Sequence, residues 1–539
     1  MEPRCLQYAA ALAVLALSHA TYQAIETDAL GRGFATTAAT EVLEETLLPE
    51  VHGTVPHWLR GDFLKQSASK YEWGKYDLTH PFDGYGKLLR WRFGPGVNNV
   101  TFRCKFLRSN FYNVSSSTGE ICPARLVGST SPKEPELPAT TNNCSDNLNV
   151  NVYRYPGNKI LALSDAMGAA SIDVSDLSTT SFQWSDNWGD KTFDKITAAH
   201  PGSTDGGQTV VNLVMRINPL AVGGVGDHKI IVYKVVGGNE RTVLHTIKVK
   251  RLPYVHSFTV TKNYIVIAAA PFTWELTKIM VAEPIFSSME WAGKQPTKIY
   301  VMRLDGTGTI AQYETPAFFA FHHINGWEDE ASDLIHFDVV ANNMDSGKIP
   351  VSVYTVANLL NVTKRKSLSA PAELRRYTLR TPSAKDRTVN VTVFPVTDAM
   401  GHTTTNFELP TINPNFNASK YCFIYLWATH FGGSSEFGTM GLIKKNICDG
   451  GDDDYDGTRS SVSTWHVHNH FPSEAVFIPA PSATREDDGV VVSVVWDGDR
   501  ETNYLVIINA TTFDTVTTLY GGDSWKHVMS FGIHGRFFD

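Results

Sequence analysis

Residues 489–520 read GVVVSVVWDGDRETNYLVIINATTFDTVTTLY, and they contain several short apolar runs. The runs are rich in valine, isoleucine, threonine and tyrosine, and they are separated by glycine, aspartate and asparagine. β-Branched and aromatic residues favour extended backbone, whereas the separating residues favour turns. The stretch therefore predicts consecutive short β-strands.

The same pattern extends through most of the chain. Comparable runs are QTVVNLVMRI (208–217), HKIIVYKVV (228–236), RTVLHTIKV (241–249), NYIVIAAAPF (263–272), TKIYVMRLDG (297–306) and DLIHFDVVA (333–341). Helical patterns are scarce, and the best candidates are VANLLNVTK (356–364) and TWELTKIMVAEPIFSSMEW (273–291). No glycine-, serine- or proline-rich linker divides the sequence, so we expect a single all-β domain.

The length of 539 residues narrows the choice of fold. A sandwich or a simple barrel is smaller, whereas a propeller of roughly seven four-stranded blades, at about 70 residues each, accounts for the whole chain. With 42% hydrophobic and 19% charged residues, the chain can bury a large core. The net charge is −8 and no stripe of lysine and arginine occurs, so we expect no nucleic-acid partner.

The first 20 residues have the features of a secretory signal peptide. The run LQYAAALAVLAL (6–17) carries no charge, and Ser18 and Ala20 occupy small-residue cleavage positions. The run is short for a membrane span, and a buried or interfacial N-terminal helix is the alternative. We therefore predict a signal peptide over 1–20, one propeller domain over 21–539, and a secreted or luminal location.

Sequons and cysteines agree with that location. Seven N-x-S/T sequons predict N-glycosylation at Asn99, Asn113, Asn143, Asn361, Asn390, Asn417 and Asn509. Five cysteines follow residue 20, and their odd number leaves one unpaired or intermolecular. We predict a disulfide between Cys422 and Cys448, which flank a hairpin-like stretch, and a second one that joins Cys122 to Cys104 or Cys144.

Four of the 18 histidines stand in apolar surroundings beside glycine, proline or a strand end. They are His200 in TAAHPG, His256 in LPYVHSF, His322 in FAFHHING and His534 in IHGRFF. The first three follow one another at intervals of 56 and 66 residues, and Glu408, Glu474 and His534 at intervals of 66 and 60. Because each blade returns the chain to the propeller axis, we expect these side chains to converge there.

Four neutral imidazoles that leave coordination positions open suit a redox-active metal such as Fe(II). Carboxylates behind the imidazoles would accept the second ring N–H, which fixes the orientation of each ring and raises its basicity. One such histidine is more often an ordinary core residue, but four together favour a metal site. The sequence therefore predicts an iron centre on the axis with acidic residues around it.

The motifs TAAHPG, VHSF, FHHIN, FELPTIN, PSEAVFIP, EDDGVVVSVV and HGRFF, in this order, resemble the carotenoid cleavage oxygenase family. The resemblance extends from VPHWLRGDFL (55–64) to the last residues. It implies a seven-bladed propeller with a loop and helix cap over its top face. It also implies that His200, His256, His322 and His534 bind one Fe(II) per chain; His322 is preferred over His323 because the family's ligand directly follows phenylalanine.

The three outer carboxylates of the family are glutamates. Two of them match Glu408 and Glu474, which would orient His322 and His534. The third matches Asp165 in ILALSDAMG, and this side chain is one methylene shorter. The resemblance therefore implies that Asp165 either approaches His256 more closely or acts through a water molecule.

The resemblance further implies Fe(II)-dependent cleavage of a carotenoid or apocarotenoid double bond with O₂, giving aldehyde or ketone products of the retinal type. No other catalytic group is required. The alternatives are a retinoid isomerohydrolase, which uses the same iron site without O₂, and a non-catalytic carotenoid-binding protein. Aromatic residues near the ligands would form a substrate tunnel, although ordinary core packing explains each equally well: Phe321, Trp327, Phe407, Phe471 and Phe537.

An apolar segment resembles the entrance at which the family contacts a membrane or lipid particle, through Trp274, Ile279 and Phe286. A buried cap helix is the alternative.

Two other patterns are tempting metal sites, but we expect no metal at either. The histidines of TWHVHNHF (464–471) supply no ligand in the family, and DGGDDDYDG (449–457) belongs to a calcium-like loop without glutamate at its twelfth position.

Overall fold

The computed structural model describes residues 28–539 apart from 36–38, 75, 125, 130–143, 166–167, 183, 185–195, 222–226, 276, 279–283, 343, 345–349, 398–400, 449–461 and 523–531. The predicted signal peptide and the acidic loop at 449–457 lie outside the described residues, as do Asn143 and Ile279. Within the described part of the chain, no helix is long and apolar enough to cross a membrane.

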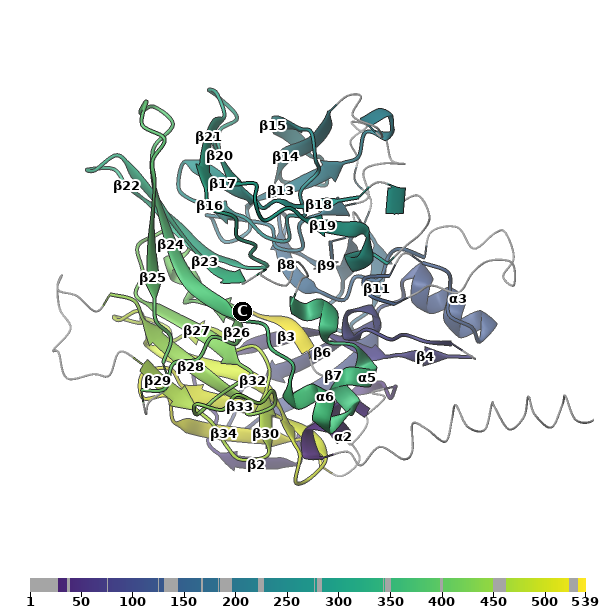
Figure 1. Cartoon of the computed structure of the whole chain (residues 1–539). Coiled ribbons are helices and arrows are strands. Elements are labelled where there is room, and N and C mark those ends of the chain that lie inside the picture. The colour runs from purple at the N-terminus through teal and green to yellow at the C-terminus, as the bar shows by residue number, and fades with distance from the viewer. Residues whose placement is uncertain are drawn as a thin grey trace, which may run out of the picture.

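Of the nine antiparallel sheets formed by the described strands, seven are arranged around an axis as the blades of a β-propeller (Figure 1). The prediction of an all-β, seven-bladed propeller is confirmed. Five blades have four strands, and the two that contain the chain ends have more. β32 (Gly489–Asp497), from the stretch that opened the sequence analysis, is buried along nearly its whole length because neighbouring blades cover both faces of its sheet.

One blade pairs β1 (Val42–Leu47), β7 (Val100–Phe106), β6 (Tyr85–Phe93), β3 (Gly61–Lys70) and β35 (Gly532–Phe538). The second blade pairs β8 (Asn151–Tyr155), β9 (Lys159–Leu163), β10 (Ala170–Ile172) and β11 (Thr179–Ser181). The third blade pairs β12 (Ile196–Thr197), β13 (Thr209–Arg216), β14 (His228–Val236) and β15 (Thr242–Val249). The fourth blade pairs β16 (Thr259–Val260), β17 (Tyr264–Ala269), β20 (Thr297–Arg303) and β21 (Ala311–Thr315). The fifth blade pairs β22 (His323–Asp329), β23 (Leu334–Asn342), β24 (Ala372–Arg380) and β25 (Val389–Phe394).

The sixth blade pairs β26 (Phe407–Thr411), β27 (Phe423–Ala428), β28 (Gly441–Asn446) and β29 (Val462–Trp465). The seventh pairs β2 (Glu50–Gly53), β34 (Thr515–Tyr520), β33 (Thr502–Asn509), β32 and β30 (His470–Pro472), with β31 (Val476–Pro479) also on β32. Two separate two-stranded sheets pair β4 (Glu72–Trp73) with β5 (Tyr76–Asp77), and β18 (Phe272–Trp274) with β19 (Met289–Trp291).

Both ends of the chain close the ring. The last strand, β35, pairs with β3 from the N-terminal part, and β2 pairs with β34 from the C-terminal part. In Figure 1 the C-terminus lies near the middle of the view, at the end of β35. A Cβ at Gly532 would lie only 2.9 Å from the backbone oxygen of Gln66 in β3, so glycine permits the close approach of β35 to β3.

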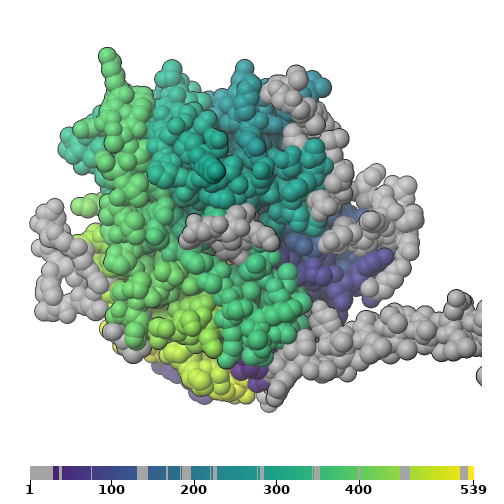
Figure 2. Space-filling model, viewed as in Figure 1, coloured from purple at the N-terminus to yellow at the C-terminus, as the bar shows by residue number. Residues whose placement is uncertain are grey.

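Helices are few, as predicted. The α-helices of the described residues are α2 (Ala29–Ala35), α3 (Asn110–Thr118), α5 (Val356–Leu360) and α6 (Val362–Lys366). Short 3-10 turns are η1 (Pro81–Asp83), η2 (Pro219–Ala221), η3 (Phe286–Ser288), η4 (Pro350–Val353) and η5 (Pro414–Phe416). α2 packs against α5, and α5 and α6 form part of the surface in Figure 2. The buried Arg365 of α6 donates to the carboxylate of Asp28 at the start of α2.

The prediction of a helix over 273–291 is wrong at both of its described ends. Residues 272–274 pair in antiparallel register with residues 289–291 as two short strands. The aromatic and β-branched side chains of Phe272, Thr273 and Trp274 favour strand, and Pro284 disfavours a continuous helix through the segment.

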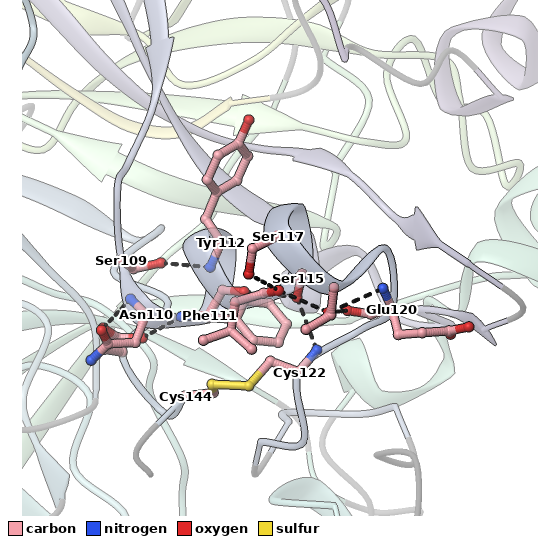
Figure 3. Close-up of a disulfide and its surroundings, with 12 residues drawn as sticks. Ser109, Asn110, Phe111, Tyr112, Ser115, Ser117, Glu120, Cys122 and Cys144 are labelled. Atoms are coloured by element: carbon pink, nitrogen blue, oxygen red, sulfur yellow. Dashed lines mark hydrogen bonds between the residues drawn. A yellow bond between two sulfur atoms is a disulfide. The ribbon is translucent and has the colours of Figure 1, made fainter. Parts of the chain in front are cut away.

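The predicted disulfide between Cys422 and Cys448 is confirmed. Cys122 pairs with Cys144, and Cys104 is a buried free thiol. Figure 3 shows the Cys122–Cys144 bond beside α3, where the backbone N–H of Cys122 donates to Oγ of Ser115 at 2.9 Å. This disulfide joins the chain on the two sides of residues 130–143 next to α3. Of the two partners that the sequence left open for Cys122, the structure therefore has Cys144.

Candidate metal centre

Four imidazoles from different blades meet at one point. His200, His256, His322 and His534 each offer a ring nitrogen, and these nitrogens all lie within 4.8 Å of one another. His534 belongs to β35, whereas the other three lie in the irregular segments beside β12, β16 and β22. These are the four histidines predicted from the sequence, and the fold brings all of them together.

Ser257 ties two of the histidine segments to each other. Its hydroxyl donates to the carbonyl oxygen of Phe321 at 2.6 Å and accepts from the backbone N–H of His323 at 2.7 Å. Ser257 also forms an isolated parallel bridge with His200. This serine is not among the residues predicted from the sequence; its position next to His256 in VHSF is the only local signal for it.

Carboxylates lie behind the rings of His322 and His534. Nδ1 of His322 is 2.5 Å from Oε2 of Glu408, and Nδ1 of His534 is 2.7 Å from Oε1 of Glu474. A proton on each Nδ1 makes both contacts hydrogen bonds from the ring to the carboxylate. The lone pair of Nε2 in each ring then points away from the carboxylate, toward the other imidazoles.

Backbone strain helps to aim Glu408. Leu409, the next residue, adopts a left-handed conformation with φ of 51°, and its N–H donates to Oε2 of Glu408 at 2.6 Å. The register of β26 against β27 shifts between Glu408 and Thr411. A bulge re-aims a side chain at the cost of local strain, and here the strained residue directly follows the carboxylate that contacts His322.

Asp165 contacts His256 without an intervening water. Both of its carboxylate oxygens lie 3.0 Å from Nδ1 of His256. Asp165 is held beside the segment that precedes His200. Its backbone oxygen accepts from the N–H of Thr197 at 2.8 Å, and its Oδ1 accepts from the N–H of Ala199 at 3.2 Å. From this position the short side chain reaches the ring of His256. Of the two arrangements that the sequence allowed, the structure has the direct one.

The residues present fit a metal cation. Nε2 of His322 and Nε2 of His534 are 3.2 Å apart, so two lone pairs face each other when both Nδ1 atoms donate to carboxylates. Nε2 of His200 is buried and has no hydrogen-bond partner, and Nδ1 of the same ring lies 3.4 Å from Nδ2 of Asn151. A cation between the rings satisfies these nitrogen atoms, and a set of four imidazoles suits a first-row transition metal.

Burial and the neighbouring carboxylates shift the pKa values of these rings in opposite directions. Burial lowers the pKa of His534 to about 4 even though Glu474 opposes the shift. Burial and the three neighbouring histidines hold the pKa of His200 well below its usual value. Burial also lowers the pKa of His322, but Glu408 and the other carboxylates outweigh this effect and the net shift is upward. Neutral rings are the form that binds a metal.

Neighbouring His323 has its own environment. Its Nδ1 is 2.7 Å from Oγ1 of Thr259, and its ring stacks on Phe337 at 5.5 Å. Burial lowers the pKa of His323 to about 3, with a smaller contribution from His322. The side chain therefore lies in a neighbouring pocket of the core, and His322 is the member of the pair that meets the other imidazoles.

We expect the metal-free protein to lose stability as the pH falls from 6.5 to 5. An unfolded histidine, with a pKa near 6.5, takes up a proton in this range, whereas folded His534 and His323 do not. The unfolded state therefore gains protons, and each of these histidines costs about 2 kcal/mol over the interval. Denaturant unfolding of the metal-free protein at pH 7 and pH 5 measures this loss; equal stability at both values contradicts it.

A cavity of about 960 Å³ opens onto three of the four imidazoles. His256, His322 and His534 line it, together with Phe321 and Tyr254. Its remaining wall is largely apolar and includes Phe34 of α2, Leu359 of α5, Trp427 of β27, Phe437 and Met440. Helices α2, α3 and α5 all contribute lining residues, so these elements cover the space above the propeller.

Four of the five predicted tunnel residues are misplaced. Phe321 lines the cavity, whereas Trp327, Phe407, Phe471 and Phe537 pack into separate core clusters. Successive side chains of a strand point to opposite faces. Phe407 immediately precedes Glu408, and Phe537 is three residues from His534, so both face away from the imidazoles.

Two of the three residues predicted to contact lipid, Trp274 and Phe286, line the cavity. Trp274 is 6% exposed and belongs to a core cluster around the cavity, because β18 and β19 fold this segment back against the propeller. Phe286 is half-buried, lines the cavity and contacts the rings of His80 and Phe82. Trp274 is therefore part of the cavity wall, and lipid contact by this segment stays a prediction.

Of the histidines of TWHVHNHF, His470 lies near Asp497 and Asp499, and the possible ligand atoms of these three residues lie within 4.8 Å of one another. The expectation of no metal at this motif stays a prediction. Nδ1 of His466 is 2.7 Å from the carbonyl oxygen of Met440, and Nδ1 of His470 is 2.8 Å from the hydroxyl of Tyr504. Each of these two rings thus has a structural partner of its own.

A β-propeller with four imidazoles on its axis, three of them backed by carboxylates, defines a class of metal-dependent enzyme fold. The family model described as retinal pigment epithelial membrane protein matches residues 36–539. The chain therefore belongs to this family, the carotenoid cleavage oxygenases. This membership confirms both the predicted family and the predicted class of enzyme.

Curated relatives carry names of the same kind. The chain is 26% identical over 538 residues to a mitochondrial carotenoid-cleaving dioxygenase of Macaca fascicularis, which covers 90% of this chain and 91% of the relative. It is 24% identical over 512 residues to the chloroplastic carotenoid cleavage dioxygenase 8 of Arabidopsis thaliana, with 90% and 82% covered. A carotenoid isomerooxygenase of Galleria mellonella is 25% identical, with 85% and 86% covered.

Solved structures share the fold. An apocarotenoid oxygenase–RPE65 chimera superposes with a TM-score of 0.74 at 21% identity, covering 95% of this chain and 98% of that one. A cobalt-substituted apocarotenoid oxygenase from Synechocystis superposes with a TM-score of 0.74 at 20% identity, with the same coverage.

The comparisons contradict the predicted secretory location. The animal relatives from Macaca fascicularis and Homo sapiens are named mitochondrial and the plant relatives chloroplastic, and nothing supports secretion. A short apolar N-terminus and N-x-S/T sequons both occur by chance, which explains why these signals misled the prediction. Glycosylation at the sequon asparagines loses its main support with that location.

Proposed function

We propose that this chain is an Fe(II)-dependent dioxygenase that cleaves a double bond of a carotenoid or apocarotenoid with O₂ and releases aldehyde or ketone fragments. The observation that carries the proposal is the convergence of four imidazoles, three of which contact a carboxylate and line one apolar cavity. The names of the curated relatives support the same substrate class.

The chain's own groups divide the work. His200, His256, His322 and His534 would hold the iron, and Asp165, Glu408 and Glu474 keep three of the rings in the tautomer that binds metal. When bound, Fe(II) supplies the activation of O₂ that no side chain provides.

The cavity would orient the substrate and exclude water from the metal site. A conjugated polyene is apolar, and burying it against Phe321, Tyr254 and Phe34 removes its surface from water. Holding one double bond beside the imidazoles makes the choice of bond a matter of geometry, because the substrate must lie along the cavity. The same apolar wall excludes water from the site.

The proposal predicts iron binding and oxygen-dependent products. We expect about one iron per chain after anaerobic loading with Fe(II), measured by metal analysis. Incubation with β-carotene, an apocarotenal and a retinyl ester, followed by chromatography, should give aldehydes from a polyene only when O₂ is present. Less than a tenth of an iron per chain contradicts the proposal, and 11-cis-retinol from the ester without O₂ replaces it with isomerohydrolase activity.

A further inference from the structure

The aspartate that supports His256 has a partner that the two glutamates lack. The hydroxyl of Tyr254 donates to Oδ2 of Asp165 at 2.8 Å and lies 3.2 Å from Nδ1 of His256. At the other two pairs, the carboxylates accept from backbone N–H groups of Leu409 and Gly535. A side-chain hydroxyl therefore joins carboxylate and imidazole only where the carboxylate is the shorter aspartate.

The position of Tyr254 is determined by its surroundings. The residue is 5% exposed, and its backbone N–H donates to the carbonyl oxygen of Phe272 at 3.0 Å. Its ring lies nearly parallel to Phe319 at 6.1 Å and meets Phe272, Trp274 and Phe321 edge-on at 6.3 Å. A ring held on several sides keeps its hydroxyl in one place.

The protons at this cluster can be assigned. Tyr254 has one hydroxyl proton, and the 2.8 Å contact to Oδ2 of Asp165 takes it. The tyrosine oxygen can then only accept from Nδ1 of His256, as the two carboxylate oxygens do at 3.0 Å. Three oxygens thus surround one Nδ1–H, and Nε2 of His256 is left with its lone pair toward the other imidazoles.

We propose that Tyr254 is a positioning residue that compensates for the missing methylene of Asp165: its hydroxyl holds the carboxylate against Nδ1 of His256 and shares that hydrogen bond. The two residues form a matched pair. A glutamate at position 165 supplies the methylene itself, whereas the aspartate carboxylate, already 3.0 Å from the ring, is held in that position by the tyrosine hydroxyl. The inference rests on the proposed function, because it assumes that the ring of His256 is a metal ligand.

A double substitution tests this pairing. We compare Tyr254→Phe, Asp165→Glu and the double variant with the wild type by titration with Co²⁺, followed through its visible absorption. Tyr254→Phe should weaken Co²⁺ binding about tenfold or more, the usual effect of removing an outer partner of a metal ligand. In the double variant, glutamate should restore most of the lost affinity. The control Tyr85→Phe removes another buried hydroxyl, bonded to Ser115 at 2.7 Å, and should leave Co²⁺ binding unchanged.

A metal-free readout separates this inference from the proposed function. In ¹⁵N-histidine-labelled protein without metal, the Nδ1 resonance of His256 should shift in Tyr254→Phe and not in Tyr85→Phe. Wild type that binds no Co²⁺ contradicts the proposed function, while the resonance still reports the hydrogen bond. An unchanged resonance in Tyr254→Phe overturns the inference, and so does a double variant that binds Co²⁺ as weakly as Tyr254→Phe.

Discussion

His534→Ala is expected to remove bound iron and to abolish oxygen-dependent product formation. The ring nitrogen of His534 faces Nε2 of His322 at 3.2 Å, and its Nδ1 is bonded to Glu474, so alanine deletes one ligand and leaves a buried carboxylate without its partner. Loss of an outer partner alone lowers metal affinity by about 10- to 100-fold, and loss of the ligand should exceed that range. Iron content after anaerobic Fe(II) loading and product formation both measure the effect.

The end of the chain offers a sharp control. Deleting Asp539, whose side chain is 92% exposed, should leave iron content unchanged. Deleting Phe538 as well removes a buried side chain from the closing strand, and we expect a loss of stability of about 3–5 kcal/mol, as for other deleted core aromatics. Near-normal iron in His534→Ala would show that the metal sits elsewhere or needs only three histidines.

Glu474→Ala is expected to have the largest effect on stability. Glu474 is 4% exposed and accepts from Nδ1 of His534 at 2.7 Å and from the N–H of Gly535 at 2.8 Å. The ammonium group of Lys65, which is fully buried, lies 3.9 Å from the same carboxylate. Removing one partner of a buried ion pair costs about 3–5 kcal/mol, because the other charge is left without compensation. Denaturant unfolding of the metal-free variant measures the loss.

Two further variants isolate the cause. Burial lowers the pKa of Lys65 to about 8, so its charge depends on the neighbouring carboxylate. Lys65→Met should lessen the penalty of Glu474→Ala when the two substitutions are combined. Glu373→Ala is the matched control: its carboxylate pairs with Arg375 at 2.7 Å but is half exposed, and such pairs contribute at most about 1 kcal/mol. Equal losses for Glu474→Ala and Glu373→Ala would contradict the role assigned to the buried pair.

Local patterns were enough to predict the strands, because alternation and turn residues act within a few positions. The four histidines could be named because motif order and blade-length spacing are also properties of the sequence. The helix predicted over 273–291 failed because its composition suits a buried strand pair as well as an amphipathic helix. The tunnel residues failed for a related reason: Phe407 is next to Glu408 in sequence but lies on the other face of β26.

The residues missed altogether act across long distances in the chain. Lys65 meets Glu474 only because β3 pairs with β35 when the ring closes. Tyr254 meets Asp165 from 89 residues away, and nothing around ILALSDAMG indicates that a tyrosine hydroxyl supports its aspartate. These contacts depend on the register of strands and on the way blades are placed around the axis.

The sequence by itself determined the kind of structure and the identity of the imidazoles, since strand propensity, turn chemistry and motif order are local. Only the tertiary structure decided that Asp165 contacts His256 directly, that Trp274 belongs to the cavity wall and that Phe321 is the tunnel residue among the five predicted. The physical reason is that distance between side chains, and the face on which each one lies, arise when the seven blades close into a ring; neither is a property of any short segment.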